Sequence, residues 1–154
     1  MNEATIKMIR QFNRAYTQQL GLLKKHVFDS DISWAEARIL LELSNLSTPT
    51  LIQISVNLEL DKSYVSRVLK KLEKLGYLTK QDSETDKRAK ILQLTKLGLE
   101  VVKKLNVASD QQIKTMMKHL NPNEQNELVM AIETINHLIL RGNDTNFEAE
   151  SLKM

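Results

Sequence analysis

The sequence contains no cysteine among its 154 residues. Structural disulfides, thiolate zinc sites and cysteine-based oxidant sensors are therefore excluded for this chain. The three histidines, His26, His119 and His137, are too scattered in the sequence to suggest a metal cage. We expect neither a metal ion nor another cofactor.

Turn-forming residues and aromatic residues are also scarce. Four glycines and two prolines favour long helices over many turns, and with only 5% aromatic residues the packing must be mostly aliphatic. The 42% of hydrophobic residues suffice for a core, so wholesale disorder is excluded. A length of 154 residues fits one domain, or one lobe with a dimerisation arm.

Long apolar runs are missing as well. No run approaches the roughly 18 residues that a membrane span needs, and the amino terminus lacks the apolar core of a secretory signal. We therefore expect a cytoplasmic protein with no membrane partner. No Ser/His/Asp, Cys/His or glycine-rich phosphate signature is present, so we do not expect an enzyme.

The charge is distributed unevenly along the chain. Residues 59–104 hold 12 of the 22 basic residues but only 7 of the 19 acidic ones, whereas the net charge of the whole chain is +3. Such a concentration is what a polyanion-binding surface requires. A merely solvated face is the alternative.

The stretch from Asp61 to Thr95 organises the rest of the chain. It begins with an amphipathic helix that Asp61 can cap and that Gly76 ends. The helix has apolar residues on one face at spacings of three and four: Val65, Val68, Leu69, Leu72 and Leu75. Its opposite face carries hydrogen-bond donors and cations: Lys62, Ser63, Tyr64, Ser66, Arg67, Lys70 and Lys71.

Two short extended segments, 77–81 and 88–94, follow this helix. The polar run 82–87 separates them, which predicts a β-hairpin with a charged tip. A donor-rich helix followed by a basic hairpin is the layout of a winged helix-turn-helix. We interpret it as a DNA-reading surface.

The segments before Asp61 fit the same layout. Ser33 and Glu36 form the pattern of a capping box at the start of a helix over 34–44. Thr50 can cap a short helix over 51–58, and a tight connection leads into the donor-rich helix. The sequence therefore predicts a DNA-binding domain over residues 29–95.

Longer helices are expected outside this domain. The first spans residues 4–27, with Gly21 weakening it without ending it, and two more span 95–119 and 122–140. All three have one apolar side, so we expect residues 1–28 and 96–141 to form a helical dimerisation region of a two-fold homodimer, followed by a polar tail over 142–154. A monomeric helical bundle is the alternative.

These residues resemble the MarR family of bacterial transcription regulators, and the match covers nearly the whole chain. The resemblance in the hairpin and its exit rests on Asp82, on Asp86-Lys87-Arg88, on Leu92-Gln93-Leu94-Thr95 and on Gly98. A second matching segment starts at Leu60-Asp61-Lys62-Ser63 and continues to Leu78. Ile54-Ser55 departs from the usual leucine-alanine pair of the family, and Ser55 needs a backbone acceptor if it is buried.

The resemblance implies a mainly α fold with a small β-hairpin wing, in a homodimer. Arg88 would enter the minor groove, and Asp86 would orient it or simply form the turn, beside Lys87. Ser63, Tyr64, Ser66 and Arg67 would face base edges, although the Tyr64 ring could instead pack on the lobe. The remaining cations of this helix would contact phosphates or face solvent alone: Lys62, Lys70 and Lys71.

The resemblance also suggests a small aromatic or anionic effector between the dimer arm and the reading lobe. Residues that could line such a crevice, or could equally be core or surface, are Phe12, Tyr16, His26, Trp34, Arg38 and Met117. The function that we expect is sequence-specific transcriptional regulation, by a dimer that reads a pseudo-palindromic double-stranded DNA operator. The alternative is a winged-helix protein-interaction module with little DNA binding.

Overall fold

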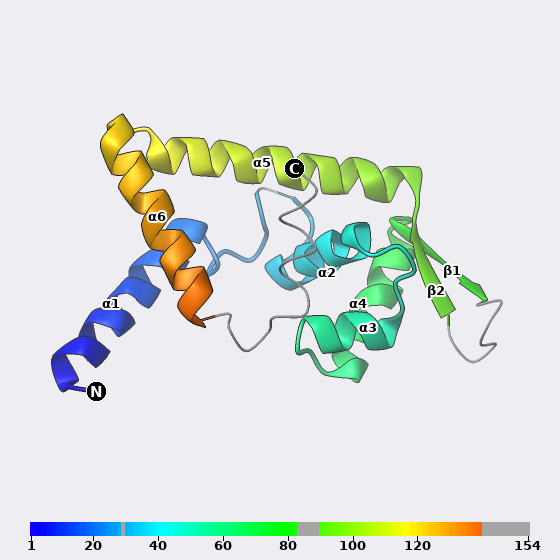
Figure 1. Ribbon diagram of the computed structural model, residues 1–154. Helices are drawn as coiled ribbons and strands as arrows, with labels where there is room; N and C mark the ends of the chain where they lie inside the picture. The colour runs from blue at the N-terminus through cyan, green and yellow to red at the C-terminus, as the bar shows by residue number, and fades with distance from the viewer. Residues whose placement is uncertain (29, 83–89, 140–154) are drawn as a thin grey trace. The chain divides into compact units, whose positions relative to one another are not determined.

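A computed structural model describes residues 1–28, 30–82 and 90–139 of the chain. The fold is mainly helical with one two-stranded antiparallel hairpin (Figure 1), as the sequence predicts. In chain order the elements are α1 (Glu3–Leu20), α2 (Trp34–Asn45), α3 (Leu51–Asn57), α4 (Lys62–Lys74), β1 (Leu78–Asp82), β2 (Lys90–Leu94), α5 (Lys96–Met117) and α6 (Pro122–Ile139). No helix in these ranges is long and apolar enough to cross a membrane.

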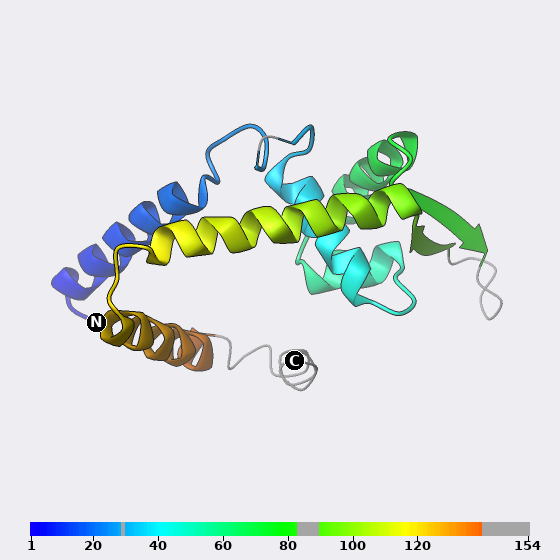
Figure 2. The same cartoon turned by 90° about the horizontal axis from the view of Figure 1, so that it is seen from above.

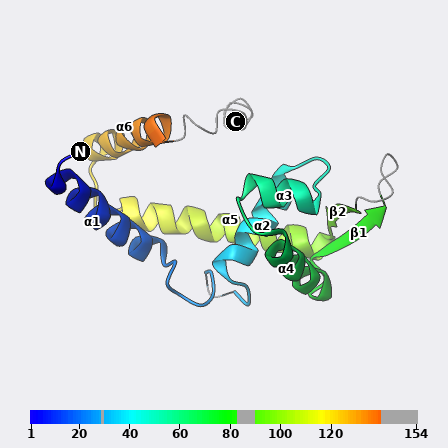
Figure 3. The same cartoon turned by 90° about the horizontal axis from the view of Figure 1, so that it is seen from below.

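The chain divides into two compact units, Met1–Gln112 and Ile113–Met154. The first unit contains α1 to α4, the hairpin and most of α5. Within it, α2, α3 and α4 lie together beside the base of the hairpin, which projects from them (Figures 1 and 3). Figure 2 shows that α5 leaves the hairpin as one continuous helix.

The core of the first unit is almost entirely aliphatic. On α4 the inward face is the predicted one, except that Leu75 is 38% exposed. On α2, Ile39 is fully buried and Leu41 is only partly buried. The buried hydrophobic residues are Val27, Ile32, Ala37, Ile39, Leu40, Leu43, Ile54, Val65, Val68, Leu69, Leu72, Leu78, Leu92, Val102 and Leu105.

Side-chain caps set where the helices start. The Asp61 carboxylate accepts a hydrogen bond from the Tyr64 N–H at 3.0 Å, as predicted. The Thr50 hydroxyl accepts one from the Gln53 N–H at 3.2 Å. These oxygens satisfy N–H groups that have no partner inside the first turn, so the starts of α3 and α4 are fixed locally.

The hairpin is joined to the helices at its base. Its strands pair in register from Leu78 opposite Leu94 to Asp82 opposite Lys90. Thr50 forms a bridge with Ile91 just before α3. This bridge, together with the register, fixes the wing against the helix-turn-helix.

The expectation that the first helix continues to residue 27 was wrong. Helix α1 ends at Leu20, because Gly21 adopts a left-handed conformation with φ of 70°. Two side chains satisfy carbonyl groups at this end: the Trp34 Nε1–H donates to the Gly21 oxygen at 3.0 Å, and the Gln112 amide donates to the Gln19 and Leu20 oxygens at 3.2 Å. The end is therefore built by tertiary contacts as well as by the glycine.

Helices α1 and α6 expose their apolar faces in the single chain. Neither helix contains a buried residue. On α1, Ile9, Phe12 and Tyr16 are 49%, 50% and 42% exposed. On α6, Ile132 and Ile135 are 41% and 39% exposed. Asn121 caps α6, because its side-chain oxygen accepts a hydrogen bond from the Glu124 N–H at 3.1 Å.

Candidate nucleic-acid interface

Four of the predicted polar residues of α4 are exposed on one face of the helix: Lys62, Ser63, Arg67 and Lys70. They are outward because the opposite face is held in the core by its apolar residues. Their donors can bind phosphate oxygens, and the Arg67 guanidinium has the fork geometry for guanine. The structure thus places these four of the predicted donor residues together on one accessible surface.

Tyr64 and Ser66 are less available than these four residues. Both are partly buried, and the Tyr64 ring packs against the core, which favours the alternative in which the ring belongs to the lobe. The guanidinium carbon of Arg67 lies 5.9 Å from the centre of that ring. A cation at this distance from an aromatic face is attracted to it, so Tyr64 helps to orient Arg67.

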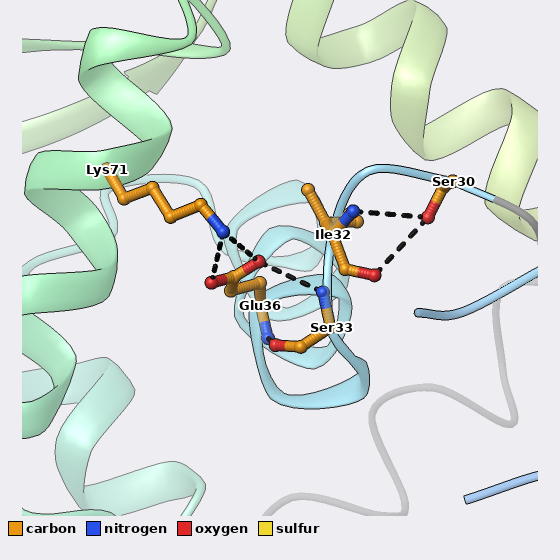
Figure 4. Close-up of polar contacts among 5 residues, drawn as sticks. All are labelled: Ser30, Ile32, Ser33, Glu36 and Lys71. Atoms are coloured by element: carbon orange, nitrogen blue, oxygen red, sulfur yellow. Dashed lines mark hydrogen bonds and ion pairs between the residues drawn. The ribbon is translucent and has the colours of Figure 1, made fainter. Parts of the chain in front are cut away.

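The Lys71 amine has a partner within the chain. Its Nζ lies 2.8 and 2.9 Å from the two carboxylate oxygens of Glu36 on α2 (Figure 4). The sequence prediction assigned this lysine to phosphate and did not find the ion pair. The spacing of Glu36 from Ser33 predicts only the capping box. No local sequence pattern predicts its contact with Lys71, which is 35 residues away.

The Glu36 carboxylate also closes the capping box of α2. It accepts a hydrogen bond from the Ser33 N–H at 2.9 Å, and the Ser33 hydroxyl accepts one from the Glu36 N–H at 3.3 Å. Burial alone would raise the pKa of this carboxyl, but the donors from Lys71 and Ser33 outweigh burial and lower the pKa below 4.5. Glu36 is therefore held ionised between two elements.

Ion pairs also connect the wing to its surroundings. The Lys80 amine on β1 lies 2.5 Å from a carboxylate oxygen of Glu73 on α4, and Lys90 pairs with Asp82 across the strands. These ion pairs connect the base of the wing to α4 and connect its two strands to each other. The predicted wing-tip residues Asp86, Lys87 and Arg88 lie outside the described residues.

The turn between α3 and α4 contains a buried serine and a strained glutamate. The Ser55 hydroxyl donates to the Leu60 carbonyl at 2.5 Å, so the backbone acceptor that the sequence demanded is present. Glu59 adopts a positive φ of 52°, a conformation that costs a non-glycine residue about 1 kcal/mol or more. These residues together close the turn of the helix-turn-helix.

A cavity of about 290 Å³ lies in the first unit between the segment before α2 and the middle of α5. Its lining combines aliphatic and aromatic residues with a serine, the acidic Asp31 and the basic Lys104. The lining residues are Phe28, Ser30, Asp31, Ile32, Tyr77, Val101, Lys104, Leu105 and Ala108. None of the six predicted effector residues is among them.

The predicted effector residues lie elsewhere in the structure. Phe12 and Tyr16 stack on each other on α1, with ring centres 5.5 Å apart and planes 9° apart. Trp34 contacts the cavity residue Phe28 edge to face, with ring centres 5.4 Å apart. His26 and Arg38 are exposed, while Met117 belongs to the second unit.

Comparison with known proteins places this surface in a family. Residues 32–90 match the model of the MarR family. The chain is 33% identical over 73 residues to the HTH-type transcriptional regulator PrsX of Escherichia coli, a match that covers 47% of this chain and 44% of PrsX. The chain thus spans less than half the length of this curated relative.

Solved structures share the fold over a larger part of the chain. Mutant MarR from E. coli complexed with operator DNA is 19% identical, with a TM-score of 0.68 over 86% of this chain and 95% of that one. BpsR of Bordetella bronchiseptica, whose DNA binding is regulated by 6-hydroxynicotinic acid, is 20% identical, with a TM-score of 0.65 over 84% of this chain and 98% of that one. The matched region, the helix order and the hairpin agree: residues 32–90 are similar to the MarR family of winged helix-turn-helix transcriptional regulators, and most of the chain shares the fold of solved MarR structures.

Proposed function

We propose that the chain is a sequence-specific regulator that binds double-stranded operator DNA through α4 and the wing. The observation that carries the proposal is the exposed, donor-rich face of α4, opposite an aliphatic face that fixes the helix in the lobe. A surface of this kind suits the major groove, which admits one α-helix. The operator-bound MarR structure supports the same use of the fold.

The residues divide into base readers and phosphate contacts. Arg67 and Ser63 are the base readers that we favour, with Ser66 and Tyr64 at their side. Lys62 and Lys70 hold phosphates and set the register without reading sequence. Lys71 reaches phosphate only by leaving Glu36, so its contribution to DNA binding is through the lobe.

The wing-tip residues complete the proposed interface. By the family resemblance, Arg88 enters the minor groove, Asp86 orients its guanidinium and Lys87 lies beside it. The braced base of the wing, with Lys80 on Glu73, is consistent with a rigid support for such a contact. Arg88→Ala should then weaken binding by about 1–3 kcal/mol while the fold is unchanged.

The proposed assembly is a homodimer through residues 1–28 and 96–141, with residues 29–95 as the DNA-binding domain and 142–154 as a tail. The support is the exposed apolar face of α1 and α6, two helices that contain no buried residue. Contiguous apolar surface of this kind marks an interaction site. A dimer also presents two α4 helices to half-sites about one helical turn apart.

We further propose that a small aromatic or anionic effector modulates the binding. The cavity beside α5 has the mixed lining that a small aromatic ligand needs, because Phe28 and Leu105 supply apolar wall, Lys104 supplies a cation and Asp31 supplies a carboxylate. The regulation of BpsR by 6-hydroxynicotinic acid supports an effector of this class. The residues predicted from sequence remain candidates, with Trp34 connected to the wall through Phe28.

Selection from random duplex DNA, followed by salt titration, tests the proposal. Selected sequences should contain inverted half-sites, and if about six phosphates are neutralised, log K should fall with log salt at a slope near −5. A slope near zero, or no binding at low salt, would favour the protein-interaction module instead. Arg88→Ala, measured on the selected duplex, separates the wing from α4.

A further inference from the structure

The residues that line the cavity continue directly into the cap of α2. Ser30, Asp31 and Ile32 form part of the cavity wall, and Ser33 follows them. The Ser30 hydroxyl donates to the Val27 carbonyl at 2.6 Å. The same hydroxyl accepts from the Ile32 N–H at 3.4 Å (Figure 4). Ile32 is only 1% exposed, so this short segment, residues 30–33, is anchored in the core.

One carboxylate joins this segment to α4. Glu36 accepts from the Ser33 N–H at 2.9 Å and from the Lys71 amine at 2.8 and 2.9 Å. Figure 4 shows the lysine reaching from α4 to the same carboxylate that closes the cap. The Glu36 side chain is 11% exposed and that of Lys71 is 48% exposed, so the carboxylate is the buried centre of the contact.

This arrangement exceeds what a capping box needs. A capping glutamate ordinarily satisfies only the start of its own helix. Here the same two oxygens also hold α4 at Lys71, one turn beyond Arg67 on the same side of a continuous helix. A shift of residues 30–33 would move the Ser33 N–H, change the geometry at Glu36, and so act on α4.

We propose that Glu36 is a positioning residue for DNA recognition, which links the state of the cavity to the placement of α4 through Ser33 and Lys71. This inference rests on the proposed function, because it assigns how that interface is controlled. The Glu36 carboxylate is only 11% exposed, so leaving it without its hydrogen-bond donors is costly, and its donors are held in a defined geometry. A small displacement of residues 30–33 should therefore change the position of α4.

A double-mutant cycle tests the link without an identified effector. Ala108→Leu fills the cavity from α5, and Lys71→Met removes the ion pair while keeping an unbranched side chain. We expect Ala108→Leu to change the Kd for the selected duplex at least about 5-fold in the wild-type background, in the range typical of allosteric coupling. In the Lys71→Met background the change should fall below about 2-fold, because the path is cut.

Two further variants control the cycle. Lys74→Met makes the same chemical change one turn along α4 at an exposed site, and the response to Ala108→Leu should survive it. Lys71→Arg keeps a cationic donor and should restore the response. Equal responses in the wild-type and Lys71→Met backgrounds, or no response in the wild type, would overturn the inference.

Amide hydrogen exchange on the free protein separates this inference from the proposed function. Ala108→Leu should change the exchange of α4 amides in the wild type but not in the Lys71→Met background, with no DNA present. If this pattern holds and no duplex binds, the proposed function fails and the link stands. If DNA binds and α4 exchange responds equally in both backgrounds, the link fails and the proposed function stands.

Discussion

The carbonyl oxygen of Tyr77 lies where a side chain on residue 98 would begin. A Cβ atom added to Gly98 would lie 1.9 Å from that oxygen. The contact is held by Thr95, whose N–H donates to the Tyr77 oxygen at 3.0 Å and whose hydroxyl accepts from the Gly98 N–H at 3.0 Å. The first turn of α5 is thereby fastened to the residue that precedes the wing.

Gly98→Ala should destabilise the protein strongly, by about 3 kcal/mol or more, because the clash involves backbone and no side chain can rotate away. Urea unfolding followed by circular dichroism measures the change. Gly21→Ala is the control, since its added Cβ meets only the flexible Lys24 side chain at 3.6 Å and its cost is confined to a φ of 70°. Similar losses in the two variants would contradict the prediction.

Ser55→Ala should cost about 1 kcal/mol of stability, since it leaves the Leu60 carbonyl without its 2.5 Å donor. Differential thermal unfolding of the two proteins gives the value. Ser44→Ala is a matched control, because its hydroxyl also donates to a backbone carbonyl, that of Leu41, but at an exposed site. The prediction fails if the exposed substitution costs as much as the buried one.

Acid should remove the contribution of Glu36. Its pKa in the folded protein is lowered from 4.5, so its stabilisation is fully present above that unfolded-state value and is lost as the pH falls through the folded pKa. The free energy of unfolding should therefore differ between wild type and Glu36→Gln by a constant amount at neutral pH, and the difference should shrink below pH 4.5. Urea titrations from pH 7 to pH 3 test this. An unchanged difference throughout would mean that the folded protein does not favour the ionised carboxyl.

Arg67 and Lys62 should differ in how they affect DNA binding. Arg67→Ala should cost about 1–3 kcal/mol on the selected duplex and relax sequence preference, because a base contact is lost. Lys62→Ala should weaken binding to all sequences alike and reduce the salt slope by about 1. Titrations of selected and scrambled duplexes at several salt concentrations distinguish the two. The assignments are reversed if only Lys62→Ala relaxes the preference.

Ile132→Glu should dissociate the proposed dimer, since burying an unpaired charge at its interface costs several kcal/mol. Sedimentation at several protein concentrations gives the mass of the particle. Asn126→Glu adds the same charge to α6 at an exposed polar position and should leave the association unchanged. A folded, fully associated Ile132→Glu protein would remove α6 from the interface.

Local patterns were sufficient to predict most of the fold. The start of α4 could be predicted because Asp61 and the apolar spacing act within a few residues. The end of α1 could not, because it depends on contacts from Trp34 and Gln112, far away in the sequence, as well as on Gly21. A glycine in a helical pattern does not reveal whether such partners exist.

The candidate site divides in the same way. The exposed donors of α4 follow from helical periodicity, so Lys62, Ser63, Arg67 and Lys70 were predictable. The Lys71–Glu36 pair and the cavity were not, because both join segments that are distant in sequence. Aromatic residues such as Phe12 are candidates for an effector site because of their side-chain type. The side-chain type alone does not predict which residues they contact in the fold.

The Gln112 amide that caps α1 follows the Gln19 carbonyl by 93 positions. Helix α1 precedes the lobe in the chain and contains no buried residue of its own, and most helical stability in proteins comes from packing of an apolar face. The lobe from α2 to β2 can assemble while α1 still lacks this cap. Helix α1, although it precedes the lobe in the chain, thus reaches its capped state only after α5 is in place.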